Sequence, residues 1–192
     1  MIDALLRLDR ELFLLLNGWH HPILDPVMVF FSGRFTWIPL YLLLLGLIVY
    51  RFKWESIRIM LMIAVLISLS DQISVNWFKF PFERLRPCHE PDLQGLIHLV
   101  TGNCGGRFGF VSSHAANSFA LASFVSLLLS SYYRRIDVIM FGWAFFVSYS
   151  RIYLGVHYPG DIIGGAILGW LIGYLVWKIY RLWVGYFCSD RC

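Results

Sequence analysis

Residues 150–177 read SRIYLGVHYPGDIIGGAILGWLIGYLVW, and this stretch combines two features that decide the fold. Its second half has no charged residue between Asp161 and Lys178. Such an apolar run approaches the roughly 20 residues that a helix needs to cross a bilayer. Its first half places Arg151, His157 and Asp161 directly before that run. Because charged groups at a membrane edge cost free energy, their presence here indicates a functional site.

The composition of the whole chain is typical of a membrane protein. Of its 192 residues, 58% are hydrophobic and 15% are charged, whereas a soluble domain carries about 25% charged residues. No Ser-, Gly- or Pro-rich linker divides the sequence, so we expect a single membrane-embedded domain over residues 1–192. We expect no cleavable signal and no nucleic-acid partner.

Hydrophobic runs predict the helices. Four segments meet or approach the length of a membrane span, and a shorter fifth begins near residue 32 or 36; these are residues 57–78, 114–133, 136–152, 161–183 and 36–50. Residues 2–16 have charges on one helical face and leucines on another, as in a helix that lies in the membrane interface. The sequence therefore predicts an all-α, polytopic membrane helix bundle with five to six transmembrane helices and an N-terminal interfacial helix.

Basic residues set the expected orientation. With alternating crossings, eight of them fall on one side, which the positive-inside rule assigns to the cytoplasm: Arg51, Lys53, Arg58, Arg134, Arg135, Lys178, Arg181 and Arg191. The segments around residues 79–86 and 151–157 then lie on the opposite side. We expect an integral protein of the bacterial cytoplasmic (inner) membrane whose site faces the periplasm or exterior.

Three distant segments bring polar residues to that outer face. They are KFPFERLRP (79–87) with Lys79, Arg84 and Arg86, VSSHAANS (111–118), and the opening stretch. Taken singly, each has a structural explanation, such as a snorkelling lysine or a serine at a helix N-cap. Together they match a phosphate group, because arginine and lysine bind its charge and a helix N-terminus with Ser112 can hold a further oxygen.

The remaining polar residues suit covalent phosphate hydrolysis. His157 is the candidate nucleophile, and Asp161, in the first turn of a helix that begins near Pro159, can reach back to hold its imidazole. His114 is the candidate acid for the leaving oxygen and the later base for water. No metal or other cofactor is expected, because the cations already stabilise the transition state and the chain lacks metal-ligand spacing.

The same residues resemble the motifs of the type 2 phosphatidic acid phosphatase family, membrane lipid phosphatases related to the vanadium haloperoxidases. The matching pattern is Lys79-x6-Arg86-Pro87, Ser112-x-His114 and Ser150-Arg151-x5-His157-x3-Asp161. The resemblance implies a metal-independent phosphatase, usually with six spans. It also implies catalytic His157, His114 and Asp161, and a phosphate pocket of Lys79, Arg86, Ser112 and Arg151.

One motif departs from the family pattern. Where the family has Pro-Ser-Gly-His, this chain has Val111-Ser112-Ser113-His114. The change removes a residue with a fixed φ angle and a residue that tolerates positive φ or close approach of a ligand. We expect Ser113 to contact phosphate through its N–H, and the departure to alter the shape of the phosphate cradle.

Two features allow two interpretations each. Asp71 lies inside a predicted span and either orients an arginine of the site or makes a packing hydrogen bond with Gln72 or Asn76. Cys88 and Cys104 share the outer loop and form either a disulfide or two free thiols.

Placement at the membrane surface indicates a lipid phosphate substrate: undecaprenyl pyrophosphate, phosphatidylglycerol phosphate, phosphatidic acid or a lipid A phosphate, hydrolysed through a phosphohistidine. The small outer loop favours a simple headgroup such as the polyprenyl carrier. The alternative is a non-catalytic phospholipid-binding or lipid-transport membrane protein, which needs the cations but not the two histidines. The sequence does not set the oligomeric state.

Overall fold

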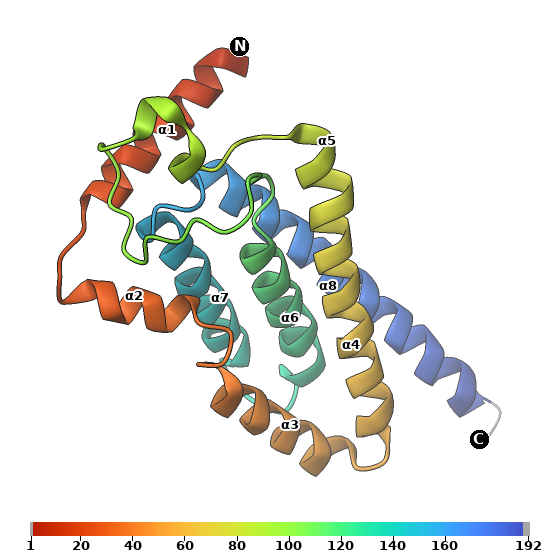
Figure 1. Cartoon of the computed structure of the whole chain (residues 1–192). Coiled ribbons are helices and arrows are strands. Elements are labelled where there is room, and N and C mark those ends of the chain that lie inside the picture. The colour runs from red at the N-terminus through yellow and green to blue at the C-terminus, as the bar shows by residue number, and fades with distance from the viewer. Residues whose placement is uncertain (1, 190–192) are drawn as a thin grey trace.

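The computed structural model describes residues 2–189, and in this range the chain forms helices and loops with no β-strand (Figure 1). The α-helices are α1 (Ile2–Gly18), α2 (Leu24–Ser32), α3 (Ile38–Phe52), α4 (Glu55–Ile73), α5 (Phe80–Phe82), α6 (Ser113–Leu129), α7 (Ile136–Tyr153) and α8 (Pro159–Ser189). A π-helix, Ser74–Lys79, joins α4 to α5, and short 3-10 turns lie at Pro87–His89 and Pro91–Leu93. The all-α prediction is confirmed.

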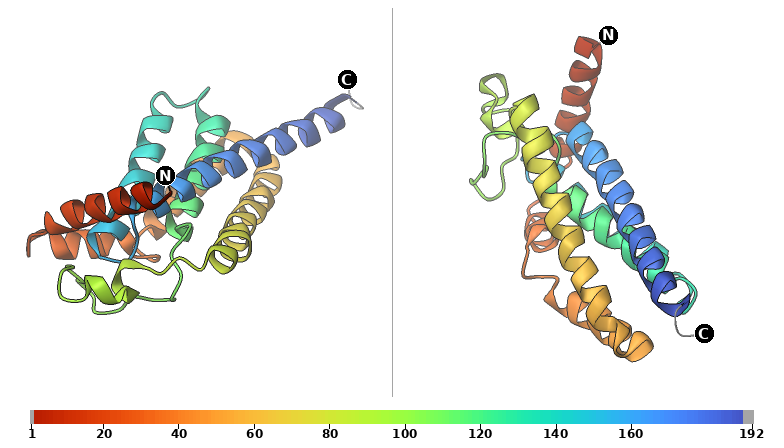
Figure 2. Two further views of the ribbon diagram at one scale, coloured as in Figure 1. Left: turned by 90° about the horizontal axis from the view of Figure 1, so that it is seen from above. Right: turned by 90° about the vertical axis from the view of Figure 1, so that its right-hand side faces the viewer.

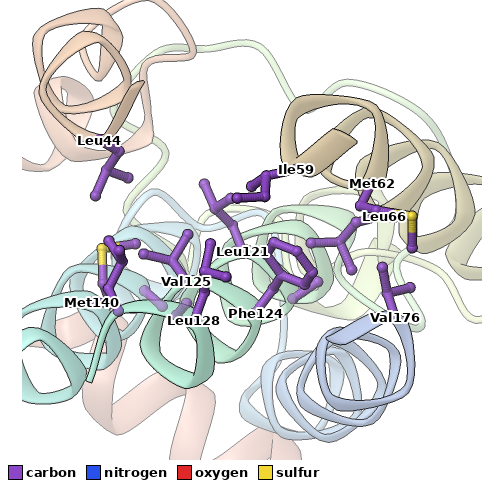
Figure 3. Close-up of a cluster of buried hydrophobic side chains, with 14 of the residues drawn as sticks. Leu44, Ile59, Met62, Leu66, Leu121, Phe124, Val125, Leu128, Met140 and Val176 are labelled. Carbon is purple, nitrogen blue, oxygen red and sulfur yellow. The ribbon is translucent and has the colours of Figure 1, made fainter. Parts of the chain in front are cut away.

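Helix α6 is the centre of the bundle. It packs against α8, α7 and α4, and residues on all of its sides are buried. Figure 3 shows its larger side chains, among them Leu121, Phe124 and Val125, between the facing side chains of the neighbouring helices. The residues of other helices labelled there are Leu44 of α3, Ile59, Met62 and Leu66 of α4, Met140 of α7 and Val176 of α8.

Glycines let α6 and α8 approach closely. Gly165, Gly169 and Gly173 recur at every fourth residue of α8 and all face α6. A Cβ on Gly165 would lie 2.6 Å from the carbonyl oxygen of Ser112, so a larger residue there would force the helices apart. The close approach brings the first turns of the two helices together, where the Ser112 N–H donates to the Asp161 carbonyl at 3.0 Å.

The segments that carry the predicted site meet at one end of the bundle. Figures 1 and 2 show α1, the loop that follows α5, and the first turns of α6 and α8 at this end, while the C-terminus lies at the other. Phe13 of α1 is fully buried and packs edge-on against Tyr158, with ring centroids 5.3 Å apart. The N-terminal helix is therefore docked on the bundle rather than separate from it.

Two helices in the described range are long and apolar enough to cross a membrane: Glu55–Phe82 and Pro159–Gly185. The helices α3 and α6 are apolar but shorter. Large apolar side chains such as Leu61, Val138 and Ile167 are more than half exposed on the outside of the bundle, as expected of a surface in contact with lipid. The number of five to six crossings stays a prediction, and Arg191, one of the residues used for orientation, lies outside the described range.

The first 33 residues differ from the sequence-based expectation in detail. The predicted interfacial helix over residues 2–16 extends to Gly18, and a second helix, α2, follows the break at residues 19–23. Sequence periodicity did not predict α2, because nine residues are too few for a membrane span and their apolar residues continue into those of the next segment.

Candidate active site

His157 and Asp161 lie at the junction between α7 and α8. Pro159 is the first residue of α8, and Asp161 in its first turn reaches back, as the sequence predicted. Its Oδ2 lies 3.2 Å from His157 Nδ1 and accepts the Tyr158 N–H at 3.0 Å. Burial, and next the charge of Arg86, lower the pKa of His157 well below its usual value, so the imidazole is neutral near pH 7. Because a carboxylate only accepts, Nδ1 carries the proton and the Nε2 lone pair is free.

Arg86 lies beside this pair. A Cβ placed on Gly109 would be 2.9 Å from Asp161 Oδ2, 3.2 Å from Arg86 Cγ and 3.6 Å from His157 Nδ1, so the three side chains surround one backbone position. The guanidinium donates to the carbonyl of Cys104 at 2.8 Å and, through Nε, to that of Phe108 at 3.2 Å. Burial lowers the pKa of Arg86, but a guanidinium stays charged in proteins. The loop that follows α5 thus fixes a cation next to the candidate nucleophile.

A disulfide between Cys88 and Cys104 closes this loop. Because the Cys104 carbonyl accepts a hydrogen bond from Arg86, the disulfide constrains the backbone that positions the arginine. Of the two interpretations of these cysteines, the structure has the disulfide.

Lys79 reaches the start of α6 from the end of the π-helix. Its ammonium donates to Ser113 Oγ at 2.6 Å, and that hydroxyl also lies 2.7 Å from Ser74 Oγ. The serine that replaces the family's glycine is therefore a partner of the lysine, and its side chain is engaged within the protein. The sequence predicted that Ser113 contacts phosphate through its N–H, which lies in the first turn of α6, and this stays a prediction. The Ser113 hydroxyl links two segments of the protein.

Ser112 and Arg151 each have a buried polar atom without a partner in the described part of the chain. Ser112 occupies the N-cap position of α6, yet its hydroxyl makes no capping hydrogen bond. Arg151, in the last turn of α7, donates from one NH group to Ser32 Oγ, whereas its Nε has no partner. Together with the N–H groups of the first turn of α6, these donors suit an anion.

His114, the second residue of α6, completes the cluster. It interacts electrostatically with Arg151, His157, Lys79 and Arg86, and it lines the adjoining cleft. His157 interacts with the same three cations. The structure therefore brings together all eight residues that the sequence singled out: Lys79, Arg86, Ser112, Ser113, His114, Arg151, His157 and Asp161.

The interpretations of Asp71 are not equally supported. It lines the cleft and interacts electrostatically with Lys79, which favours a role in orienting a cation of the site. The cation is a lysine, where the sequence suggested an arginine. Asn76 donates to Gln72 at 2.8 Å, so those two residues bond to each other.

Sequence reasoning missed two charged residues that contact the site. Arg84 donates to Asp161 Oδ1 at 3.0 Å and to Asp9 Oδ2 at 2.7 Å. Arg84 was noticed with its neighbouring cations but received no role, and nothing marked Asp9 among the charges of the N-terminal helix. Their 75-residue separation explains this, because only three-dimensional structure brings them together.

An apolar cleft of about 490 Å³ opens next to the site. Ser113 and His114 line it at one end, Val125 lines it three turns further along α6, and Trp37 and Ile48 of the α3 region face them. Twelve residues of helix correspond to about 18 Å, which suits an extended hydrocarbon chain. The cleft therefore connects a polar, cation-rich end to a long apolar surface.

Comparisons with known proteins agree with this arrangement. The profile of the PAP2 superfamily matches residues 58–184. The lipid A 4′-phosphatase of Bacteroides thetaiotaomicron is 39% identical over 181 residues, which cover 93% of this chain and 80% of that protein. The lipid A 4′-phosphatase of Porphyromonas gingivalis is 35% identical over 195 residues, with 97% and 80% covered.

A solved structure shares the fold. The transmembrane PAP2 type phosphatidylglycerolphosphate phosphatase from Bacillus subtilis superposes with a TM-score of 0.72 at 23% identity, covering 93% of this chain and 87% of that one. The resemblance to the phosphatase family and the prediction of an enzyme are confirmed. This chain belongs to the PAP2 superfamily, and it is a membrane lipid phosphatase of that type.

Proposed function

We propose that the protein removes a phosphate monoester from lipid A or a closely similar phosphorylated glycolipid, with His157 as the nucleophile. The observation that carries the proposal is the placement of the His157 imidazole, whose Nδ1 lies 3.2 Å from Asp161 and which interacts with cations from two sequence-distant segments, Lys79 and Arg86 on one and Arg151 on the other. Two relatives that match 93% and 97% of this chain are named lipid A 4′-phosphatases, which supports the choice of lipid.

In the first chemical step, His157 Nε2 forms a bond to phosphorus while the bond from phosphorus to the lipid oxygen breaks. His114 gives its proton to that oxygen, and the lipid leaves as an alcohol. Asp161 stabilises the positive charge that develops on the imidazole. The products of this step are a phosphohistidine and the dephosphorylated lipid.

In the second step, water attacks the phosphohistidine. His114, now neutral, takes a proton from the water as the P–N bond breaks, and inorganic phosphate leaves. Lys79, Arg86 and Arg151 offset the charge on the equatorial oxygens in both transition states, aided by Ser112 and the N–H groups at the start of α6. These roles need no metal.

The cleft supports a lipid substrate because it begins at His114 and continues along apolar side chains. A phosphate bound among the cations would leave acyl chains free to follow this surface. The small outer loop led the sequence analysis to favour a polyprenyl carrier, whereas the relatives favour lipid A. Both lipids present a phosphate on a long hydrocarbon anchor, and the glycolipid has the stronger support.

The proposal includes the membrane arrangement expected from the sequence: one domain with five to six crossings in the bacterial inner membrane, the site facing the periplasm. Labelling of single cysteines introduced near residues 95 and 135 of a cysteine-free variant, in intact and in permeabilised cells, tests this orientation. Labelling of position 135 in intact cells would contradict it.

The function is tested by initial rates of phosphate release from lipid A, phosphatidic acid, phosphatidylglycerol phosphate and undecaprenyl pyrophosphate in one detergent. We expect the highest kcat/KM on lipid A and no turnover by His157→Ala, which keeps the cations. A phosphoryl group on His157 should be trapped by rapid quenching in alkali. Equal rates for wild type and His157→Ala would refute the nucleophile, and a preference for another lipid would refute the substrate.

A further inference from the structure

The N-terminal helix reaches the catalytic end of the protein although it lies outside the part that matches the superfamily. That match begins at residue 58, whereas Asp9 of α1 contacts residues on both sides of the site. Asp9 Oδ1 accepts the N–H of Gly160 at 2.7 Å, and its Oδ2 accepts from Arg84 at 2.7 Å. One carboxylate thus binds the first turn of α8 and an arginine of the outer segment.

Arg84 continues this contact to the catalytic pair. Its second NH group donates to Asp161 Oδ1 at 3.0 Å, while Oδ2 of the same carboxylate lies 3.2 Å from His157 Nδ1. Asp9, Arg84 and Asp161 therefore form a network of alternating charge, which we call the N-terminal ion-pair network. Its side chains are 14%, 20% and 0% exposed, so water screens these pairs less than it screens surface pairs.

The surroundings leave the guanidinium little freedom. Arg84 lies over the ring of Tyr158, 4.2 Å from its centroid, and Phe13 of α1 packs against the same ring. A Cβ on Gly160 would come within 2.7 Å of Asp9 Oδ2, so α1 lies against bare backbone at this point. Helix α1 thus supplies one of the two carboxylates that bind Arg84, and it also supplies Phe13, which packs against the ring under the guanidinium.

We propose that Asp9 and Arg84 are positioning residues that fix the Asp161 carboxylate and, through it, the imidazole of His157. The helix α1 is therefore part of the catalytic apparatus. This inference rests on the proposed role of His157. The Asp161 carboxylate can rotate about its own side chain unless both oxygens are held. The Tyr158 N–H and the imidazole hold Oδ2, and Arg84, oriented by Asp9, holds Oδ1.

The test is a double-mutant cycle with Asp9→Asn, Arg84→Gln and the combination, assayed on dioctanoyl phosphatidic acid in detergent. Asparagine keeps an oxygen for the Gly160 N–H but removes the charge. We expect each single variant to lower kcat about tenfold, as for loss of a hydrogen bond between charged groups, with little change in KM. The double variant should be no slower than the slower single one, because Asp9 acts through Arg84.

Asp92→Asn is the matched control. Asp92 also pairs with an arginine of α1, Arg10, at 3.6 Å, but its side chain is 78% exposed and it is not part of the N-terminal ion-pair network. It should keep the wild-type kcat. Folding of every variant is checked by gel filtration and thermal unfolding. If Asp9→Asn does not fold, it is replaced by Asp9→Glu, which keeps the charge but displaces it. We expect the same loss of kcat in Asp9→Glu.

Three outcomes would overturn the proposal. One is a kcat within twofold of wild type for folded Asp9→Asn or its substitute. Another is a double variant whose loss is the product of the single losses, which would show independent action. The third is an equal loss in Asp92→Asn, which would indicate a general effect of charge near α1. Turnover by His157→Ala would instead refute the proposed function, so the two failures are distinguishable.

Discussion

The contact between α6 and α8 predicts a large effect from one added methyl group. In Gly165→Ala the new Cβ would lie 2.6 Å from the carbonyl oxygen of Ser112, where ordinary contact begins at 3.4 Å. The conflicting atom belongs to the backbone, so a side-chain rotation cannot relieve it. The first turns of the helices must separate by about 0.8 Å, the difference between these distances.

This separation acts on the proposed chemistry directly. Ser112 at the start of α6 donates its N–H to the Asp161 carbonyl at 3.0 Å, and moving α8 by about 0.8 Å stretches that bond beyond normal length. The same movement shifts the imidazole of His157 relative to the helix N-terminus that is proposed to bind phosphate. Because a misplacement of about 1 Å can cost about 100-fold in rate, we expect kcat/KM to fall 30- to 100-fold, roughly. Overpacking should also lower the free energy of unfolding by about 1–3 kcal/mol.

The assay is phosphate release by purified protein that elutes as a single species in detergent, alongside thermal unfolding. Gly142→Ala on α7 is the matched control, since no atom lies within 4 Å of its added Cβ. The control should keep full activity and gain slightly in stability, because alanine favours a helix. Wild-type activity in folded Gly165→Ala would refute the reasoning that the α6–α8 spacing sets the geometry of the site.

Three further outcomes are expected. Replacing Cys88 and Cys104 by serine should raise KM several-fold by loosening the loop that holds Arg86, which is proposed to bind phosphate, and a reducing agent should affect wild type but not this variant. Ser113→Ala removes the acceptor of Lys79 and should raise KM about fivefold, whereas Ser113→Thr, which keeps the hydroxyl, should stay near wild type. The pKa of His157 is depressed by burial, so below about pH 6.5 the unfolded chain binds a proton that the folded protein does not. The free energy of unfolding should therefore fall as the pH is lowered below about 6.5, by up to about 1.4 kcal/mol per pH unit. His157→Gln should show a shallower decline of melting temperature as the pH is lowered from about 7.5 to 5.

The sequence predicted the parts of the site that depend on local geometry. Asp161 lies four residues after His157. In a helix that begins at Pro159, this spacing directs the Asp161 carboxylate back toward the imidazole of His157. Apolar runs likewise predicted the helices that carry the three motifs. The convergence of those motifs was an inference from chemistry, since a phosphate group accounts for all of their polar residues at once.

What the sequence did not predict depends on long-range packing. The pairing of Asp9 with Arg84 spans 75 residues and leaves no periodic signal in either segment. The interaction of Ser113 with Lys79 required knowing that the π-helix ends beside the start of α6. The helix α2 was missed because nine residues are too few for a membrane span, and the contact of its Ser32 with Arg151 of α7 is again a long-range one.

The two sides of the cleft differ in how firmly they are built. The catalytic side rests on α6 and α8, which glycines hold in close contact and whose first turns are joined by the Ser112–Asp161 hydrogen bond. The other side, with Trp37, Tyr41 and Ile48, comes from residues that precede the superfamily match at residue 58. Changes there can reshape the surface next to a lipid chain without moving the imidazole or its cations. Under the proposed function, the choice of lipid and the phosphate chemistry therefore depend on separate helices.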